Sequence, residues 1–567
     1  MDKLSIYKKP LYEARKITDL KDMIHSSCEI YADTAAFLVK KEGAYSPITY
    51  KQYMEDINAL GTKLTDMGLK GARIAVVGEA SYRWAVTYLA VLCGVGVIVP
   101  LDKELPQEEM ENLIDIADVK MIIYSPKVKT ITDDINVQYK IPMDEAFDKL
   151  VEEGRELLKN GDTRYIDATI DPEEMSILLF TSGTTGMAKG VMHNHRTICV
   201  NLQSMVTMFY VGPGDVFLSV LPIHHTYECT CGFLCAIYRG CTIAHCEGLK
   251  HIVNNLKESK ATVVLGVPLL FEKMYNTINK TIDKNGMRKK VNFAIKLSNF
   301  LKFFGIDVTK KLFKQIHDNF GGHLRVFISG AAGIDPKIPK GFRNFGIQMI
   351  QGYGLTECAP IAALNRDILY KDDAAGLPLP GVELKIDNPN AEGVGEVLIK
   401  GKNVMLGYYN APDLTAEAIV DGWYHSGDLG YIDEDSFLHI TGRMKSVIIT
   451  KNGKNVFPEE LEAYLDRSKY IEESMILGKE SDDDVVISAQ IIPNYAEFEA
   501  EFGSDYTQDE LVGVIKDEIA KVNDIVQGYK RIVKFSIRLR PFEKTTTQKI
   551  QRFKSENISE EGNIIGR

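Results

Sequence analysis

The chain is 567 residues long, with 45% apolar and 26% charged residues, a composition typical of globular proteins. A single hydrophobic core stops growing near about 250–300 residues, so we expect two to four folding units. The 67 lysine and arginine residues and 78 aspartate and glutamate residues give a net charge of −11. This balance excludes an overall attraction to nucleic acid or anionic lipid, so an anionic ligand needs a local binding site.

The amino-terminal residues 1–16, MDKLSIYKKPLYEARK, contain no apolar segment, so the sequence predicts no secretory signal. The nine cysteines are scattered along a large chain. Both features favour reduced thiols and a cytoplasmic protein.

Short β-branched runs alternate with helical patterns from about residue 30 to residue 250 and again further on. This alternation predicts an α/β fold with largely parallel sheets. The predicted strands include Arg73–Gly78, Met121–Tyr124, Ile177–Phe180, Thr262–Val267 and Leu324–Ser329.

The longest apolar run, Trp84–Leu101, reaches the length of about 18 residues at which a membrane span becomes a candidate. Gly94 and Gly96 interrupt the run and Pro100 ends it. We therefore expect a buried helix, a turn and a buried strand, and no transmembrane segment.

The segment Ile177–Gly190, ILLFTSGTTGMAKG, predicts a strand that runs into a phosphate-binding loop. Glycines allow several backbone N–H groups to converge on one anion, while hydroxyl groups and a lysine add donors and charge. An amphipathic helix near Thr197 could bring a positive helix end close to the loop. The Walker A pattern is absent, which argues against a P-loop kinase or GTPase. The candidate phosphate ligands are Thr181, Ser182, Gly183, Thr184, Thr185, Gly186 and Lys189.

Five cysteines between Cys229 and Cys246 lie near His224, His225 and His245. Zinc sites usually contain two closely spaced cysteine pairs, and this pattern is absent here. We therefore expect buried small residues more than a metal site.

The segment Arg288–Phe320 is rich in lysine, phenylalanine and leucine at helical spacing. Phe300, Phe303 and Phe304 are expected on one face. One interpretation is a helical pair with a solvated basic face. The other is a surface that docks on a membrane or collects a lipophilic substrate.

Two further segments follow predicted strands. Ser329–Gly333, SGAAG, would bring Gly330, Ala331 and bare backbone against an adenine ring. Gln351–Glu357, QGYGLTE, would stack Tyr353 on a purine, let Thr356 donate to a phosphate oxygen, and let Glu357 hold Mg²⁺. Gly352 and Gly354 flank the aromatic ring.

After Gly376 short strands and tight turns predict a small β subdomain, with a turn at Asp433–Ser436. We expect Asp428 in a turn, where its carboxylate can accept ribose hydroxyl groups, with Arg443 reaching the same sugar. A boundary near Arg443–Ser446 divides the expected domains into residues 1–443 and 444–567.

The carboxy-terminal part has an α+β pattern. Pro458 suits a first helical position, and Thr507 to Glu510 forms a capping box that opens another helix. Alternating residues from Val533 to Arg540 predict a half-buried strand.

In this order, from about residue 70 to residue 552, the segments resemble those of the adenylate-forming enzymes: acyl-CoA synthetases, firefly luciferases and the adenylation domains of nonribosomal peptide synthetases. The resemblance implies a large amino-terminal domain of two α/β subdomains and a β subdomain, followed by a smaller mobile α+β domain. It also implies ATP, Mg²⁺ and coenzyme A as ligands.

The same resemblance implies residue roles. His225, in Leu221–Glu228 (LPIHHTYE), lines the acyl entrance and the catalytic centre. Lys549, in KTTTQKIQR, is the catalytic lysine that bridges the carboxylate and the α-phosphate; the family usually has glycine where this chain has Gln548. Lys445 is the hinge residue, and the thiol-binding segment contains Lys451, Asn452 and Gly453.

These features predict an AMP-forming acid–thiol ligase. Carboxylic acid and ATP give acyl-AMP and pyrophosphate, and a thiol then accepts the acyl group. The LPxxHxYE segment and the basic helical insertion most resemble long-chain fatty-acyl-CoA synthetases. An aryl or bile acid, an acyl carrier protein as acceptor, and a non-catalytic acyl- and nucleotide-binding protein stay open as alternatives, as does peripheral contact with the inner membrane face.

Overall fold

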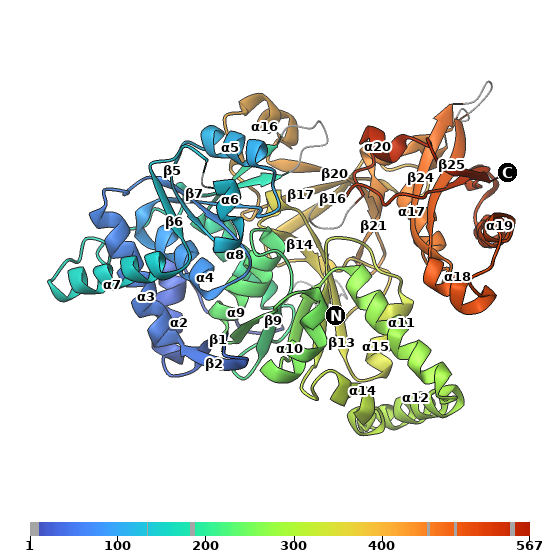
Figure 1. Cartoon of the computed structure of the whole chain (residues 1–567), viewed down its shortest axis with the longest axis horizontal. Helices are drawn as coiled ribbons and strands as arrows, with labels where there is room; N and C mark the ends of the chain where they lie inside the picture. Colours follow the sequence, from blue (N-terminus) through green and yellow to red (C-terminus); the bar gives the residue numbers. More distant parts are fainter. Residues whose placement is uncertain are drawn as a thin grey trace. The chain divides into compact units, whose positions relative to one another are not determined.

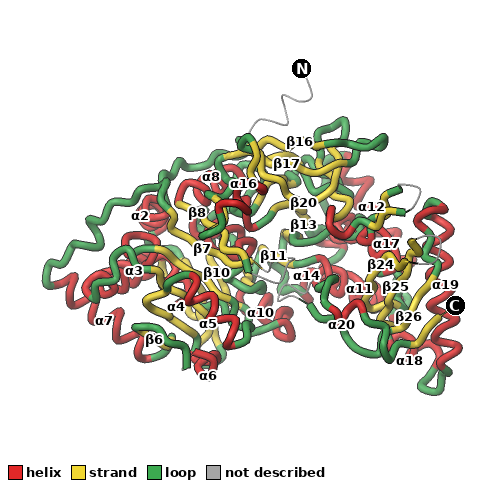
Figure 2. Tube along the Cα trace, turned by 90° about the horizontal axis from the view of Figure 1, so that it is seen from above, coloured by secondary structure: helices red, strands yellow, loops and turns green. Residues whose placement is uncertain are grey.

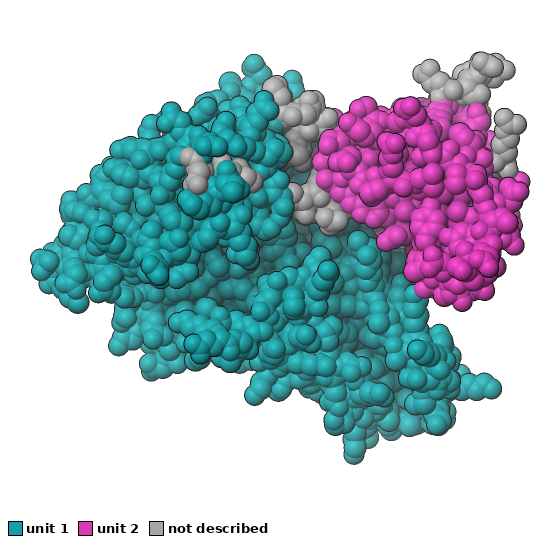
Figure 3. Space-filling view, viewed as in Figure 1, with its two compact units in different colours: residues 1–384, 399–425, 433–438 teal, residues 385–398, 426–432, 439–567 magenta. Residues whose placement is uncertain are grey.

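The computed structural model describes residues 11–132, 134–181, 188–450, 454–480, 485–544 and 550–566. The chain forms two compact units (Figure 3). Unit 1 comprises Met1–Leu384, Ile399–His425 and Asp433–Leu438, and unit 2 comprises Lys385–Leu398, Ser426–Ile432 and His439–Arg567.

The first sheet of unit 1 has seven strands. Its order is β18 (Gly407–Tyr408), β8 (Lys189–Asn194), β7 (Met175–Thr181), β4 (Val97–Leu101), β3 (Arg73–Val77), β5 (Val119–Tyr124) and β6 (Tyr139–Pro142). The strands from β7 to β6 run parallel, whereas β8 and β18 are antiparallel to their neighbours. The predicted strands at 73–78, 121–124 and 177–180 are confirmed.

The run at residues 84–101 folds as the sequence predicts. Helix α4 (Tyr82–Ala90) continues as a π-helical turn (Val91–Val95), and β4 follows. Gly94 has φ of 156°, and a Cβ on Gly96 would lie 2.2 Å from the carbonyl oxygen of Ala72. Glycine at both positions lets the chain turn back tightly against the sheet. No helix in the described part of the chain is long and apolar enough to cross a bilayer.

The second sheet of unit 1 has nine strands. Its order is β15 (Leu377–Pro378), β14 (Ile361–Leu364), β13 (Gln348–Gly354), β12 (Val326–Ser329), β11 (Val263–Gly266), β9 (Val216–Ser219), β10 (Thr242–His245), β1 (Ala35–Lys41) and β2 (Ala44–Thr49). The strands from β13 to β1 are parallel, so their carboxyl ends share one edge. Ligands of α/β sheets bind at this kind of edge.

Helices cover both sheets, and Figure 2 shows strands such as β7 and β10 between them. Helix α3 (Tyr50–Asp66) packs against both α4 and α7 (Glu145–Lys159) (Figure 1). Helix α5 (Gln107–Ile116) contributes Met110 and Leu113 to the core of the seven-stranded sheet. The other helices of unit 1 are α2 (Leu20–Tyr31), α3 (Tyr50–Asp66), α5 (Gln107–Ile116), α6 (Lys129–Thr132), α7 (Glu145–Lys159), α8 (His195–Met205), α9 (Cys235–Tyr238), α10 (Ile252–Ser259), α11 (Pro268–Lys284), α12 (Arg288–Phe303), α13 (Thr309–Leu312), α14 (Lys314–Asn319), α15 (Lys337–Asn344) and α16 (Pro412–Ala418).

A third sheet has the order β16 (Val382–Asp387), β17 (Gly395–Gly401), β20 (Trp423–Ile432) and β19 (Ile419–Val420), with β21 (Leu438–Arg443) beside β20. The predicted small β subdomain is confirmed. Ser436 has φ of 69° in the predicted turn between β20 and β21.

The α+β pattern predicted for the carboxy-terminal part is confirmed in unit 2. A four-stranded sheet of β24 (Ile471–Glu480), β25 (Val485–Pro493), β26 (Lys534–Ile537) and β27 (Ile564–Gly566) packs with helices around its own core. Pro458 is the first residue of α17, and Thr507 and Glu510 form the capping box of α19. The remaining elements are α17 (Pro458–Leu465), α18 (Tyr495–Phe502), α19 (Gln508–Ile525), α20 (Ser555–Ile558) and the strand pair β22 (Ile448–Ile449) and β23 (Asn455–Val456).

Candidate active site

The predicted phosphate loop joins two antiparallel strands. Thr181 ends β7 and pairs with Lys189, the first residue of β8. The predicted ligands Ser182, Gly183, Thr184, Thr185 and Gly186 lie outside the described residues.

The sequence predicted a positive helix end close to this loop, and this prediction is wrong. Helix α8 begins at His195, and its cap Asn194 pairs with Met175 at the opposite end of the hairpin. A strand rises about 3.4 Å per residue, so the length of β8 separates the helix end from the loop. The helical pattern near Thr197 is correct, but the sequence reading missed the intervening strand.

Lys189 and Glu357 are linked through Tyr408. Nζ of Lys189 lies 4.9 Å from the centre of the Tyr408 ring, and the Tyr408 hydroxyl donates to Oε1 of Glu357 over 3.0 Å. Burial and the nearby Glu357 carboxylate raise the pKa of Tyr408, so the phenol stays protonated and remains a donor. The sequence reading missed Tyr408, which lies outside every motif.

The backbone around Thr356 is braced by a buried imidazole. Nε2 of His193 donates to the Thr356 carbonyl oxygen over 2.7 Å. Burial lowers the pKa of His193 to about 4, so this ring is neutral at physiological pH. The Thr356 hydroxyl also lies 3.5 Å from the hydroxyl of Thr226. The segments 221–228 and 351–357 therefore meet.

His225 is half-buried and contacts His224, with ring centres 4.1 Å apart and ring planes tilted by 41°. Nε2 of His224 lies 3.4 Å from Oδ2 of Asp102, the residue directly after β4. Burial and the adjacent His225 lower the pKa of His224 to about 3, so His224 adds no positive charge at neutral pH. We interpret His224 as a neutral brace that holds the His225 ring in place.

Tyr227 lies directly against Gly330. Its hydroxyl donates to the Ile328 carbonyl oxygen over 2.9 Å, and a Cβ on Gly330 would lie 2.8 Å from its ring. Ala331 has φ of 72°, a conformation rare for residues other than glycine. The bare backbone predicted after β12 is therefore present at the carboxyl edge of the nine-stranded sheet.

Gly352, Tyr353 and Gly354 form the end of β13, which pairs with β14. A Cβ on Gly354 would lie 1.9 Å from the carbonyl oxygen of Pro360, so no larger residue fits without a backbone shift. The Tyr353 side chain is half-buried in this strand. Its place at the strand end is compatible with the predicted stacking on a purine.

Glu228 is a buried carboxyl group that the sequence reading named only as part of a motif. Its side chain is 1% exposed. Burial raises its pKa to about 7. Within the described part of the chain, neither Oε2 of Glu228 nor Oγ of Ser219 has a hydrogen-bond partner.

In unit 2, Nε of Arg443 lies 2.8 Å from Oδ1 of the buried Asp428. Asp428 lies inside β20, not in a turn as predicted, because Gly427 with φ of 66° accommodates a local irregularity without ending the strand. Asp428 and Arg443, which were both expected to reach one sugar, are thus paired with each other. The hinge candidate Lys445 lies in a short 3₁₀ turn, Met444–Ser446. Lys451, Asn452, Gly453 and Lys549 lie outside the described residues.

The predicted burial of small cysteines is confirmed for Cys229, Cys231, Cys235 and Cys241. Among the described residues, Asp102, His224 and His225 form the one group of three potential metal ligands. Because the two rings are in close contact and His224 faces Asp102, we assign this group to the bracing described above. For Mg²⁺, the carboxylate of Glu357 is suitable, since this hard cation takes few protein carboxylates and keeps water.

Comparison with known proteins identifies the family. The "AMP-binding enzyme" model matches residues 24–409, and the "AMP-binding enzyme C-terminal domain" model matches residues 445–560.

Individual proteins agree with these family matches. Mouse (Mus musculus) long-chain-fatty-acid–CoA ligase ACSBG2 is 27% identical over 81% of this chain and 75% of its own length. The chloroplastic long-chain-fatty-acid–[acyl-carrier-protein] ligase AEE15 of Arabidopsis thaliana is 25% identical over 84% of this chain and 76% of its own length.

The fold also matches a solved structure. That of the anthranilate CoA ligase AuaEII in complex with anthranoyl-AMP superposes with a TM-score of 0.77 at 18% identity, covering 98% of this chain and 99% of the other. This match shows the fold, and the two family models show that the chain belongs to the AMP-binding enzyme family, the adenylate-forming enzymes that include the acyl-CoA ligases.

Proposed function

We propose that this chain is an AMP-forming acid–CoA ligase that acts on a long-chain fatty acid. In the first step a carboxylate oxygen forms a bond to the α-phosphorus of ATP, and the bond to the β-phosphate oxygen breaks. Acyl-AMP and pyrophosphate result. In the second step the thiolate of coenzyme A attacks the acyl carbon, and AMP leaves with the electron pair of the broken C–O bond.

The observation that carries this proposal is the connected group at the carboxyl edge of unit 1. Lys189 contacts Tyr408, Tyr408 donates to Glu357, and the neighbouring Thr356 lies beside Thr226. The group joins the end of a glycine-rich loop to a hydroxyl group and a carboxylate. Carboxylate and ATP are both anions, so the reaction needs fixed charge and donors where negative charge develops.

Each residue then has a specific task. Lys189, Thr181 and the loop donors Ser182, Gly183, Thr184, Thr185 and Gly186 bind the polyphosphate. Thr356 donates to a phosphate oxygen, and Glu357 would hold Mg²⁺, which neutralises phosphate charge when bound. Gly330, Ala331, Gly352, Tyr353 and Gly354 form the adenine site, and His225 orients the acyl carboxylate. Asp428 binds the ribose hydroxyl groups, while Arg443 holds its carboxylate.

Lys549 supplies positive charge to the attacking carboxylate and the α-phosphate. The thiol needs the same space in the second step, so the domain beyond residue 443 rotates about Lys445. Lys451, Asn452 and Gly453 then guide the thiol arm. No side chain is required to form an acyl-enzyme, so catalysis depends on positioning and electrostatics.

The names of the relatives support the substrate class, since ACSBG2 is a ligase of long-chain fatty acids and coenzyme A. The LPIHHTYE segment supports the same choice. The name of AEE15 supports an acyl carrier protein as the alternative acceptor. We further propose a cytoplasmic location with peripheral contact at the membrane.

The test is exchange of radiolabelled pyrophosphate into ATP, measured with acids of short, medium and long chain and with an aromatic acid. We expect exchange that depends on acid and on Mg²⁺, strongest with a long chain. Acyl-CoA should form when coenzyme A is added and not when acyl carrier protein replaces it. Failure of every acid to support exchange would refute the ligase proposal.

A control separates the two half-reactions. Lys549→Ala should lose exchange while still transferring the acyl group from supplied acyl-AMP to coenzyme A. The exposed Lys554, which lies close in the sequence, provides the matched variant Lys554→Ala, and this should leave both half-reactions unchanged. Near-normal exchange by Lys549→Ala would show that Lys549 is not the catalytic lysine.

A further inference from the structure

Helix α12 carries an apolar stripe on its free face. Phe293, Leu297 and Phe300 recur at spacings of four and three residues, the period of one helix face, and Phe304 continues the series just after the helix. Their exposed fractions are 68%, 37%, 63% and 60%, and Phe303 beside them is 85% exposed. The rings of Phe300, Phe303 and Phe304 contact one another through Phe304, with centres 5.2 and 5.4 Å apart.

The opposite face of α12 packs against the rest of unit 1. Val291, Ala294 and Ile295 pack on a small core formed by Ile282, Phe313 and Phe345. Figure 1 shows α12 beside α11 at one margin of unit 1. The phenylalanine stripe is therefore not needed to hold the helix to unit 1. Large exposed aromatic groups that touch one another usually mark a binding surface.

Positive charge surrounds the stripe. Residues 288–314 contain eight lysine or arginine residues and one aspartate, whereas the whole chain has a net charge of −11. Arg288 pairs with Asp283, and Lys302 and Lys314 pair with Asp307 and Asp318. Within the described residues no carboxylate pairs with the remaining five, which are Lys289, Lys290, Lys296, Lys310 and Lys311.

We propose that the free face of α12 docks on the surface of an anionic lipid bilayer. The phenylalanine rings enter the boundary between headgroups and acyl chains, while the flanking lysines contact lipid phosphates. Lysine stems are long enough to keep their charges at the headgroups while the rings lie deeper. This proposal decides between the two interpretations of the Arg288–Phe320 segment and names the lipid class that it recognises.

The combination of features distinguishes a bilayer from other occupants. A second copy of this chain would bring the same lysines together, and their like charges would repel. A neutral apolar protein would leave the five free lysines without partners. An anionic bilayer satisfies both the aromatic rings and the charges at once.

The test is co-sedimentation of the full chain with vesicles, without ATP or acid. Phosphatidylglycerol mixed with phosphatidylcholine should bind the protein, and pure phosphatidylcholine should bind it at least about tenfold more weakly. The triple variant F300S/F303S/F304S should lose about tenfold or more in partitioning to the anionic vesicles. K289Q/K290Q/K296Q should lose a similar factor and should also lose most of the salt dependence.

The matched control is F502S/F553S, which removes two phenylalanines that are 45% and 56% exposed elsewhere on the chain. It should bind like the wild type, and equal circular dichroism spectra establish that every variant is folded. Equal binding to neutral and anionic vesicles, or none, would overturn the proposal. So would a dimer in light scattering that F300S/F303S/F304S converts to monomer, because the occupant would then be a second copy.

The docking proposal and the ligase proposal fail separately. Pyrophosphate exchange with a short acid tests only the site at the sheet edge, and F300S/F303S/F304S should leave it unchanged. A chain that catalyses exchange but ignores vesicles would refute docking alone.

Discussion

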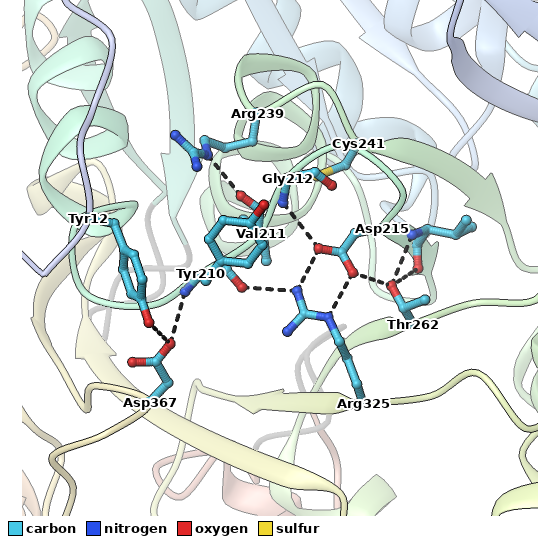
Figure 4. Close-up of polar contacts among 11 residues, drawn as sticks. Tyr12, Tyr210, Val211, Gly212, Asp215, Arg239, Cys241, Thr262, Arg325 and Asp367 are labelled. Atoms are coloured by element: carbon cyan, nitrogen blue, oxygen red, sulfur yellow. Dashed lines mark hydrogen bonds and ion pairs between the residues drawn. The ribbon is translucent and has the colours of Figure 1, made fainter.

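The two edges of the nine-stranded sheet differ in how their polar groups are satisfied. At the amino edge, Asp215, Thr262 and Arg325 each stand directly before a strand: β9, β11 and β12. Figure 4 shows Asp215 between the other two. Arg325 donates twice to the Asp215 carboxylate, over 2.7 and 2.5 Å, and the Thr262 hydroxyl donates over 2.8 Å.

The amino edge is also tied to more distant parts of unit 1. Arg325 donates to the Tyr210 carbonyl oxygen, and the Tyr210 N–H and the Tyr12 hydroxyl both donate to Asp367. Burial raises the pKa of Asp215, but the hydrogen bonds and charge of Arg325 outweigh burial, so the pKa lies below its ordinary value. Both oxygens of Asp215 accept hydrogen bonds, so the group of Asp215, Thr262 and Arg325 is a satisfied network of the kind that stabilises a fold.

The carboxyl edge retains groups that the protein itself does not satisfy. Ser219 Oγ, Glu228 Oε2 and both ring nitrogens of His245 make no hydrogen bond within the described part of the chain. Glycines replace side chains at 330, 352 and 354. Such an edge contributes less to stability and leaves polar groups and space for a ligand. The same sheet thus keeps a satisfied network at the amino ends of its strands and open polar groups at their carboxyl ends.

The largest effect should follow a change at the carboxyl edge, Glu357→Gln. The amide keeps an oxygen that can accept from Tyr408 but removes the negative charge that would hold Mg²⁺. We expect pyrophosphate exchange to fall about 10²–10³-fold, with the thermal midpoint little changed. The exposed Glu417 on α16 provides the control Glu417→Gln, which should change neither the exchange rate nor the thermal midpoint. Exchange near the wild-type rate in Glu357→Gln would remove this residue from the site.

At the amino edge, Asp215→Ala should have the reverse effect of Glu357→Gln: it should lower the stability of the fold and leave pyrophosphate exchange intact. The change leaves Arg325 and Thr262 without their shared partner, so unfolding free energy should fall by about 3 kcal/mol, measured by urea denaturation. Exchange at low temperature should persist. The more exposed pair of Arg83 and Asp148 supplies the control, because Asp148→Ala should cost less than about 1 kcal/mol. Equal costs for the two variants would contradict the role given to the amino edge.

The sequence alone predicts some residues of the carboxyl edge and misses others. The strand runs and the order of the motifs identify the carboxyl edge because glycines and hydroxyl groups directly follow apolar segments, as at Ser329–Gly333. Local patterns cannot find Tyr408 or His193, whose roles depend on contacts with a segment distant in sequence. The antiparallel strand β8 was missed for a different reason. Its residues, KGVMHN, contain a glycine and three polar side chains, so neither the helical nor the strand period of apolar residues is evident.

The buried Glu228 at the carboxyl edge should also make the stability of the protein depend on pH. The folded state raises the pKa of Glu228 from 4.5 to about 7, so its contribution to stability is present below pH 4.5 and is lost as pH rises through 7. The amide of a Glu228→Gln variant does not titrate. This variant should therefore gain about 1–3 kcal/mol relative to the wild type between pH 5 and pH 8, measured by urea unfolding. Histidine titrations cancel in this difference because both proteins contain them. A difference independent of pH would show that the Glu228 pKa is ordinary in the folded state.

The smallest effect should distinguish the two contacts of Tyr408 at the carboxyl edge. Tyr408→Phe removes the hydroxyl that donates to Glu357 but keeps the ring beneath Lys189, so we expect about tenfold slower exchange. Tyr408→Leu also removes the ring, and the loss of a cation–π contact should slow exchange by a further factor of about two to five. If the Phe and Leu variants are equally slow, the ring does not position Lys189. If the Phe variant equals the wild type, Glu357 does not need the phenol, and the connection from lysine to carboxylate is only a matter of packing.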